Sequence, residues 1–195
     1  MNEVHNLAEV NIRVYPLKMN EQGKRMYKIE RKMIMAIRNI REIGDKVLNK
    51  VAKEIKEVDK KILELIEDMF DTMYETGGVG LAAPQVGVLK RLVVIDVSEE
   101  GNEPITLINP VIIETDGEQT GDEACLSIPG KVGTVTRPNY VKVKAFDKNM
   151  EEFTVEGTGL LARAFCHEID HLDGKLYKEI AIGELRDVLM TEEVQ

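Results

Sequence analysis

Apolar residues recur with a helical period in the first half of this chain and gather into strand-like runs in the second half. After Asp59 they are spaced to form one broad stripe, made by Ile62, Leu63, Leu65, Ile66, Met69, Phe70 and Met73. Asp59 has a side chain suited to an N-cap, and the Gly77-Gly78 pair is expected to end the helix. The pattern therefore predicts an amphipathic helix between these two signals.

Two further helices are predicted on either side of it. Asp45 is a candidate N-cap for a short helix, in which Val47, Leu48, Val51 and Ile55 recur at helical spacing. Gly159 precedes another helical stretch, residues 160–172.

Strand-like runs lie between the last two predicted helices. They cover residues 92–97, 105–113 and 141–146, and a turn at residues 147–149 leads to a fourth run, residues 153–155. Helices followed by strands and then a helix predict an α+β fold, and alternating β-α units are not indicated. We expect small antiparallel or mixed β-sheets packed around the last helix.

The length of the chain limits its domain organisation. At 195 residues it can build one good core, and a second full domain would be cramped. Residues 1–34 carry mixed charge and weak periodicity, whereas the pattern sharpens from Met35. We predict that residues 1–34 are an N-terminal extension of uncertain status and that residues 35–195 form the main domain.

Charge and hydropathy exclude several classes of function. A net charge of −9 argues against a surface that binds nucleic acid directly. No apolar run approaches the length of a membrane span, and no secretory signal peptide is evident. We therefore expect a cytoplasmic protein whose two cysteines, Cys125 and Cys166, are reduced. In that compartment a metal-binding or catalytic cysteine is a better expectation than a disulfide.

The predicted helix over residues 160–172 contains the sequence His167-Glu168-Ile169-Asp170-His171, which matches the H-E-x-x-H pattern of zinc proteases. On a helix, the histidines at i and i+4 project from one face and can bind one ion. Glu168 then lies beside the metal, where its carboxylate can accept a proton from water. The alternative is an exposed, charged helix face that carries two histidines by chance.

Two histidines need a third protein ligand to make a catalytic site with an open position. Cys125, in the segment Glu123-Ala124-Cys125-Leu126-Ser127, is the remaining soft ligand, although it could instead be a small buried apolar residue. Asp170 has two interpretations: it orients a ligand histidine from behind, or it faces solvent.

A third segment, Gly78-Val79-Gly80-Leu81-Ala82-Ala83-Pro84-Gln85, directly follows the long predicted helix. Its glycines permit unusual backbone angles and the close approach of an extended peptide. Gln85 offers an amide N–H that could stabilise an oxyanion. No Gly-Lys-Ser/Thr follows, so the segment is not a phosphate-binding Walker loop. Alone, it could equally be a connecting turn.

Together and in this order, GVGLAAPQ (78–85), EACLS (123–127) and HEIDH (167–171) closely resemble the peptide deformylase family. The resemblance covers roughly residues 35–177, and Met35-Ala36-Ile37 looks like the usual start of the family. It implies an α+β fold and removal of the N-formyl group from the first methionine of new polypeptides. One departure is that Ala124 stands where the family usually has glycine. If that position requires a positive φ, alanine would cost on the order of 1 kcal/mol.

The resemblance also implies roles for individual residues, carried over by motif position. Cys125, His167 and His171 would bind the metal, and Glu168 would be the general acid and base. Gln85 and the backbone N–H of Leu126 would form the oxyanion hole. Substrate would be bound by the backbone of residues 78–80, with Val79 and Leu160 lining an apolar pocket for the methionine side chain.

The implied metal is one Fe²⁺ per chain, with Zn²⁺, Ni²⁺ or Co²⁺ as substitutes on the same ligands. The implied partners are formyl-methionyl nascent peptides, and a transient contact with the ribosome is compatible with that substrate. Two other functions stay open: a zincin-type endopeptidase, and a metal-binding or ribosome-associated module without activity. The first is disfavoured because Cys125 is a better third ligand than any residue after His171. The second would require a broken catalytic set, yet Glu168 and Gln85 are both present.

Overall fold

The computed structural model describes residues 12–19, 25–31 and 36–188, and its internal contacts divide the chain into two compact units, Met1–Ala36 and Ile37–Gln195. In the first unit, strands β1 (Ile12–Met19) and β2 (Arg25–Arg31) pair as an antiparallel hairpin. The predicted extension, residues 1–34, falls partly outside the described residues. Its separation from the main domain stays a prediction.

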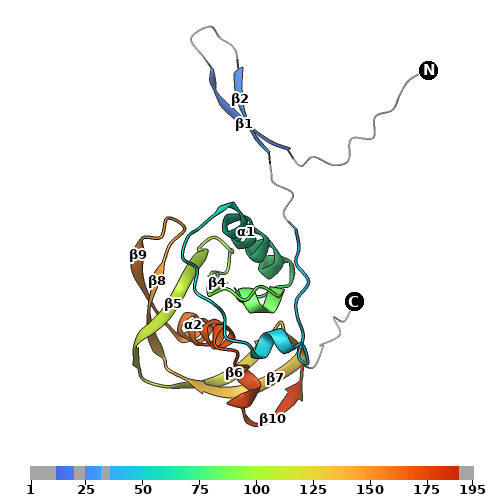
Figure 1. Ribbon diagram of the computed structural model, residues 1–195, viewed down its shortest axis with the longest axis vertical. Helices are drawn as coiled ribbons and strands as arrows, with labels where there is room; N and C mark the ends of the chain where they lie inside the picture. The colour runs from blue at the N-terminus through green and yellow to red at the C-terminus, as the bar shows by residue number, and fades with distance from the viewer. Residues whose placement is uncertain (1–11, 20–24, 32–35, 189–195) are drawn as a thin grey trace, which may run out of the picture. The chain divides into compact units, whose positions relative to one another are not determined.

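The second unit contains two antiparallel sheets (Figure 1). The larger has the strand order β3-β4-β5-β8-β9, with β3 at Gly80–Ala82, β4 at Leu92–Ile95, β5 at Ile105–Asp116, β8 at Tyr140–Phe146 and β9 at Glu152–Thr158. The smaller has the order β10-β7-β6, with β6 at Gln119–Cys125, β7 at Ile128–Arg137 and β10 at Ile182–Asp187. Strands β3 and β6 are therefore each the last strand of a sheet, with one edge left unpaired within the described residues.

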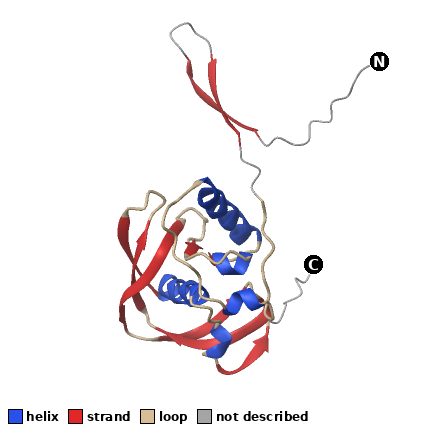
Figure 2. Cartoon of the chain, viewed as in Figure 1, coloured by secondary structure: helices blue, strands red, loops and turns tan. Residues whose placement is uncertain are grey.

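Among the described residues this unit also has two α-helices and three short 3-10 helices, all coloured blue in Figure 2. Helix α1 (Lys60–Glu75) begins where the sequence predicts, because the Asp59 side chain accepts a hydrogen bond of 2.9 Å from the backbone N–H of Ile62. It packs most of the predicted stripe against β3 and β4, with Ile66, Met69 and Met73 fully buried, but Leu63 is 40% exposed and does not belong to the buried face. Its end is followed by Gly77, which has a φ of 67°.

Helix α2 (Gly159–Leu172) lies in the interior, where it contacts strands of both sheets (Figure 1). Phe165 and Leu172 on this helix pack into one core cluster with Val93, Leu107 and Val143 of the larger sheet. The α+β fold with small sheets around the motif-bearing helix is confirmed. The helix that carries the HEIDH segment is thus fixed on several sides.

The predicted helix over residues 46–55 is wrong beyond its first turn. Asp45 does cap a helical turn, but this is a 3-10 helix limited to Lys46–Asn49. The following segment is extended, because its backbone bonds to the core: the Ala52 N–H donates to Leu172 O, and Lys53 pairs with Lys90. Val51 is 66% exposed, which shows that the apolar spacing did not mark one buried face.

Several helical or strand elements were not expected from the sequence, and three of them shape the site. Strand β6 and most of β7 lack a clear apolar alternation, and Pro129, Gly130 and Gly133 interrupt β7. A 3-10 helix at Ala83–Val86 follows β3 and carries Gln85.

No helix among the described residues is both long and apolar enough to cross a membrane.

Candidate active site and metal centre

Helix α2 places His167 and His171 one turn apart on its buried side. Their rings are 5.0 Å apart between centroids, and only 8% of His167 and 1% of His171 is exposed. The alternative of an exposed charged face is therefore wrong. Two buried imidazoles on adjacent turns are arranged as ligands of a single ion.

Cys125 ends strand β6 and brings a sulfur atom to these histidines. Its Sγ lies 3.3 Å from His171 Nε2, and one ligand atom from each of Cys125, His167 and His171 falls within 4.8 Å of the others. Cys125 is buried, as the apolar interpretation expects, but it faces the histidines from a neighbouring sheet. The structure thus brings together all three residues that the sequence singled out as metal ligands.

Glu123, which sequence reasoning missed, lies behind His167. Its Oε2 is 2.9 Å from His167 Nδ1, so that nitrogen is engaged and Nε2 is left to face the ligand cluster. Burial alone would raise the pKa of Glu123, but the hydrogen bonds with His167 and Arg137 lower it to about 2. A carboxylate in this position fixes the tautomer and the ring orientation of a ligand histidine.

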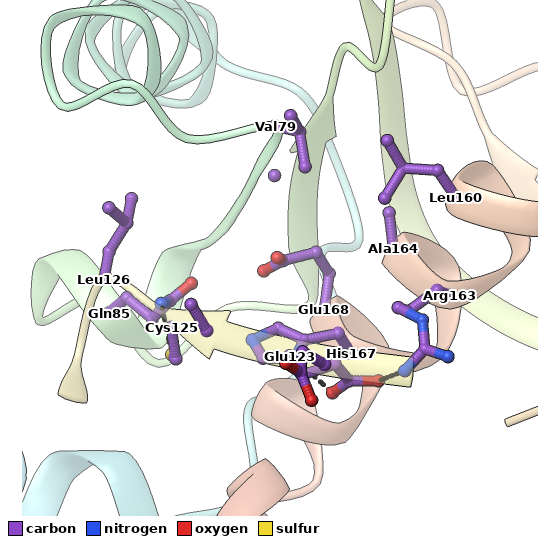
Figure 3. Close-up of a pocket in the computed structure, with 13 residues that line it drawn as sticks. Val79, Gln85, Glu123, Cys125, Leu126, Leu160, Arg163, Ala164, His167 and Glu168 are labelled. Carbon is purple, nitrogen blue, oxygen red and sulfur yellow. Dashed lines mark hydrogen bonds and ion pairs between the residues drawn. The ribbon is translucent and has the colours of Figure 1, made fainter. Parts of the chain in front are cut away.

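Two arginines, also missed, hold the Glu123 carboxylate, and Figure 3 shows one of them, Arg163. Arg137 donates from Nε and Nη2 at 2.9 and 3.1 Å, and Arg163 donates from Nη1 at 2.9 Å. Arg163 lies four residues before His167 on α2, so helical spacing alone could have indicated it. Asp170 accepts from Arg137 at 2.6 Å, so it acts on the histidines only through Arg137 and Glu123.

The electrostatics of the cluster suit a cation. Burial would lower the pKa of His167, but hydrogen bonding to Cys125 and Glu123 and the charge of Glu168 raise it to about 10. Burial holds the pKa of His171 well below its usual value, so this imidazole is neutral. The Cys125 sulfur, the neutral His171 imidazole and the carboxylate-backed His167 imidazole therefore meet at one point, where Glu123 and Glu168 favour positive charge on His167. This donor set fits zinc or a divalent transition metal and is poorly suited to magnesium or calcium.

Glu168 points into the open side of the site, between Gln85 and Leu160 (Figure 3). It is buried, and its Oε2 has no hydrogen-bond partner among the described residues. Burial raises the pKa of Glu168 to about 7. A carboxyl group with such a pKa can both accept and donate a proton near neutral pH.

Gln85 faces the cluster from the 3-10 helix after β3. Its Oε1 accepts from the Ala82 N–H at 2.8 Å, and its Nε2 donates to Ser127 Oγ at 3.3 Å. This fixes the amide so that its N–H group is directed towards Cys125, with 3.5 Å between Nε2 and Sγ.

A segment near the start of the domain forms backbone hydrogen bonds with both Gln85 and Ser127. The Arg41 N–H donates to Gln85 O at 2.7 Å, and the Ile43 N–H donates to Ser127 O at 2.8 Å. We call residues 41–43 the strap. It links the Gln85 side of the site to the turn that follows Cys125.

A pocket of about 220 Å³ opens beside the cluster and is lined by Val79, Gly80, Gln85, Asp122, Glu123, Ala124, Cys125, Leu126, Leu160, Arg163, Ala164, His167 and Glu168. Val79 is 42% and Leu160 is 53% exposed, so both apolar side chains are accessible at this pocket. Leu126 and the glycine segment lie on the same side as Gln85. All residues proposed from the sequence for substrate contact are thus at or beside this pocket.

Backbone angles correct one expectation about the three motifs. Among residues 78–85, none has a positive φ, and Gly77 just before them does. Ala124 also lacks a positive φ, so its side chain carries no backbone strain. The family's usual glycine at this position is therefore not required by the conformation found here.

Comparison with known proteins agrees with the geometry. The family model for polypeptide deformylase matches residues 37–184. A peptide deformylase of Lachnoclostridium phytofermentans is 72% identical over 159 residues, covering 82% of this chain and 98% of its own. A second, from Agathobacter rectalis, is 63% identical over 79% of this chain and 96% of its own.

Solved structures of peptide deformylases also align with this chain. The crystal structure of a peptide deformylase from Legionella pneumophila aligns with a TM-score of 0.73 and 47% identity, covering 75% of this chain and 87% of that one. The Synechococcus elongatus enzyme, solved in complex with actinonin, aligns with a TM-score of 0.73 and 40% identity, covering 78% and 84%. The chain therefore belongs to the polypeptide deformylase family, the metal-dependent hydrolases that remove the N-formyl group from the N-terminal formyl-methionine of newly synthesised polypeptides.

Proposed function

We propose that this chain carries out deformylation with Cys125, His167 and His171 as metal ligands and Glu168 as the proton-transfer group. The observation that carries the proposal is the convergence of three buried ligand atoms within 4.8 Å, beside a buried carboxyl group whose Oε2 has no hydrogen-bond partner among the described residues. Gln85 and the Leu126 backbone N–H are the proposed donors to the oxygen of the formyl group. The endopeptidase and inactive-module alternatives are excluded by the family to which the chain belongs.

The metal is proposed to be Fe²⁺, and the same ligands would accept Zn²⁺, Ni²⁺ or Co²⁺. When bound, such an ion lowers the pKa of water and polarises a carbonyl group. The thiolate supports a soft or borderline ion, and affinity order alone does not select iron among them. The choice of iron rests on the family resemblance.

Glu168 is proposed to take the proton released when water attacks the formyl carbon and to deliver it to the leaving amine. Its pKa of about 7 supports both directions of transfer. Negative charge that develops on the formyl oxygen would be stabilised by the Gln85 amide, whose orientation is fixed by Ala82 and Ser127. The fixed orientation means that little reorganisation is needed when the charge appears.

Substrate is proposed to bind as an extended strand between β3 and β6. Both are end strands of their sheets and line the same pocket, so their free backbone groups can pair with a peptide. Gly78, Val79 and Gly80 would supply such pairing on the β3 side. The exposed side chains of Val79 and Leu160 would then bury the methionine side chain.

The chain acts on nascent formylated peptides, and from this we place its action in the cytoplasm. A transient contact with the ribosome would bring the site to new N-termini as they emerge. The net charge of −9 supports a contact that does not rest on direct nucleic-acid binding.

The proposal is tested by Glu168→Gln, which keeps the size of the side chain and removes its ability to accept a proton. Turnover of a formyl-methionyl peptide should fall by about 10²–10⁴-fold while the metal content is unchanged. The same assay on an unformylated peptide with internal bonds should give no cleavage with either protein. Near-normal deformylation by a metal-loaded Glu168→Gln protein would contradict the assigned role.

A further inference from the structure

Gly80 occupies a position where any side chain would collide with Glu168. A Cβ atom built on Gly80 would lie 2.6 Å from Glu168 Oε1 and 2.9 Å from both its Cδ and Cγ. These contacts are shorter than carbon atoms tolerate. Because the clash includes Cγ, turning the carboxylate alone would not relieve it.

The backbone of Gly80 gives no other reason for a glycine. Its φ is not positive, so alanine could adopt the same conformation without strain. It also pairs with Ile95 in the regular antiparallel register of β3 and β4. The requirement for a hydrogen atom in place of a methyl group therefore comes from Glu168.

Neither backbone can move away to make room. Leu81 and Ala82, which follow Gly80 in β3, are fully buried in two core clusters. On the other side, Ile169 and Cys166 flank Glu168 on α2 and are packed in the core. An added methyl group at Gly80 must consequently be accommodated by a different rotamer of Glu168.

We propose that Gly80 is a positioning residue for the reaction: its missing side chain forms the slot that holds the Glu168 carboxyl group in its working rotamer. This inference rests on the role proposed above for Glu168. Gly80 would then have two roles: its backbone pairs with the substrate, and its lack of a Cβ atom leaves space for the Glu168 side chain. A shift of Glu168 by about 1 Å is enough to cost on the order of 10²-fold in rate.

Gly78 provides a matched control in the same segment. A Cβ atom on Gly78 would meet Leu126 Cδ1 at 2.9 Å, at the end of a flexible side chain, and would not approach Glu168. Gly78→Ala and Gly80→Ala make the same chemical change on the same side of the pocket and restrict the unfolded chain equally. They differ in the side chain that must move.

The kinetic experiment compares kcat and KM of the two variants with a formyl-methionyl peptide, at equal metal content. Gly80→Ala should lower kcat by about 10²-fold with a smaller change in KM. Gly78→Ala should act mainly on KM.

A second measurement avoids activity and metal altogether. In metal-free protein, Gly80→Ala should lower the melting temperature by roughly 3–10 °C, as expected for overpacking in a domain of this size. In a Glu168→Ala background this loss should vanish, because the colliding atoms are gone. If Gly80→Ala alone fails to fold, the double variant should fold.

Three results would overturn the inference. The first is an equal loss of melting temperature on Gly80→Ala in the wild-type and Glu168→Ala backgrounds. The others are failure to fold of both Gly80→Ala and the Gly80→Ala, Glu168→Ala double variant, or a Gly80→Ala defect confined to KM. Normal turnover of Glu168→Gln would instead refute the role of Glu168, and the thermal coupling between Gly80 and Glu168 would still be measurable. The two failures are therefore distinguishable.

Discussion

Glu123 and His167 form a buried carboxylate–imidazole pair, with 2.9 Å between Oε2 and Nδ1. The pair determines which nitrogen of His167 is available to a metal, and Arg137 and Arg163 determine where the carboxylate lies. His167, a proposed metal ligand, is thus held in place by Glu123 directly and by Arg137 and Arg163 through Glu123.

The first prediction follows from this pair. Glu123→Gln should weaken metal affinity by about 10–100-fold, because the amide is a weaker acceptor and leaves two arginines without their carboxylate partner. Affinity is measured by competition with a chelator at constant pH. Glu152→Gln, a surface change on β9, is the control and should leave affinity as it is; an unchanged affinity in Glu123→Gln would contradict the prediction.

The second prediction concerns Ala124, the departure from the family's usual glycine. Because its φ is not positive, Ala124→Gly should destabilise the protein by about 0.5–1 kcal/mol through the added freedom of the unfolded chain. Denaturant unfolding measures the difference. A strained alanine would give the opposite sign, so a gain in stability would refute the description of this strand.

The third prediction uses the hydrogen bond of 2.7 Å between Tyr74 Oη and Asp96 Oδ2. Burial and this bond raise the pKa of Tyr74 to about 12. The neutral phenol is therefore favoured by folding, and its contribution is complete below the unfolded pKa near 10 and is lost as the pH rises towards 12. Tyr74→Phe should cost about 1 kcal/mol at pH 8.

The measurement is the free energy of unfolding of both proteins from pH 8 to 12, in the same metal state. The difference in free energy of unfolding between wild type and Tyr74→Phe should decrease as the pH approaches 12, because only the wild type loses the hydrogen bond. A difference that stays constant over this range would show that the Tyr74 hydroxyl does not titrate as described.

The fourth prediction concerns the metal. If Fe²⁺ is the resident ion, activity should decay in air, since both the ferrous ion and the Cys125 thiolate can be oxidised. Replacement by Ni²⁺ or Co²⁺ should preserve turnover and remove most of the sensitivity. The protein is purified without oxygen or added metal, analysed for metals and followed in air. An air-stable, fully active protein that contains only zinc would defeat the iron assignment.

The fifth prediction concerns the start of the catalytic domain. A chain that begins at Met35 should fold and deformylate like the full chain, because Arg38 still pairs with Asp68 at 2.7 Å and the strap is complete. A chain that begins at Asp45 lacks the strap and should lose activity. Equal activity of these two shortened chains would show that the strap does not hold the site, and loss of activity at Met35 would show that the extension matters.

The sequence predicted the parts of this molecule that depend on local pattern. Helix α1 was found because a cap and a full apolar stripe agree, and the ligand histidines because helical spacing places them on one face. The segment after Asn49 was missed because tertiary hydrogen bonds, and not propensity, keep it extended. The sequence alone could not show that the Cys125 sulfur lies 3.3 Å from His171 Nε2, and the role of Cys125 as a ligand stays a proposal.

Glu123 was missed for a more specific reason. It lies two residues before Cys125, so both side chains share one face of β6 once that segment is known to be a strand. The segment was not recognised as a strand because it is polar and acquires its form by pairing with β7. Arg137 is further still from local inference, because the register pairs it with Gln119 and pairs Glu123 with Gly133, and only the long Arg137 side chain reaches the carboxylate.

The strap has a consequence for the order in which the protein is made. The groups that form the site are spread from Arg41 in the strap to His171 in α2, and synthesis runs in that direction. A growing chain that has not yet released α2 lacks two of its three proposed metal ligands, however well its first helix has folded. An enzyme that works on unfinished polypeptides is therefore itself inactive as an unfinished polypeptide, and its activity begins only when nearly the whole domain has emerged.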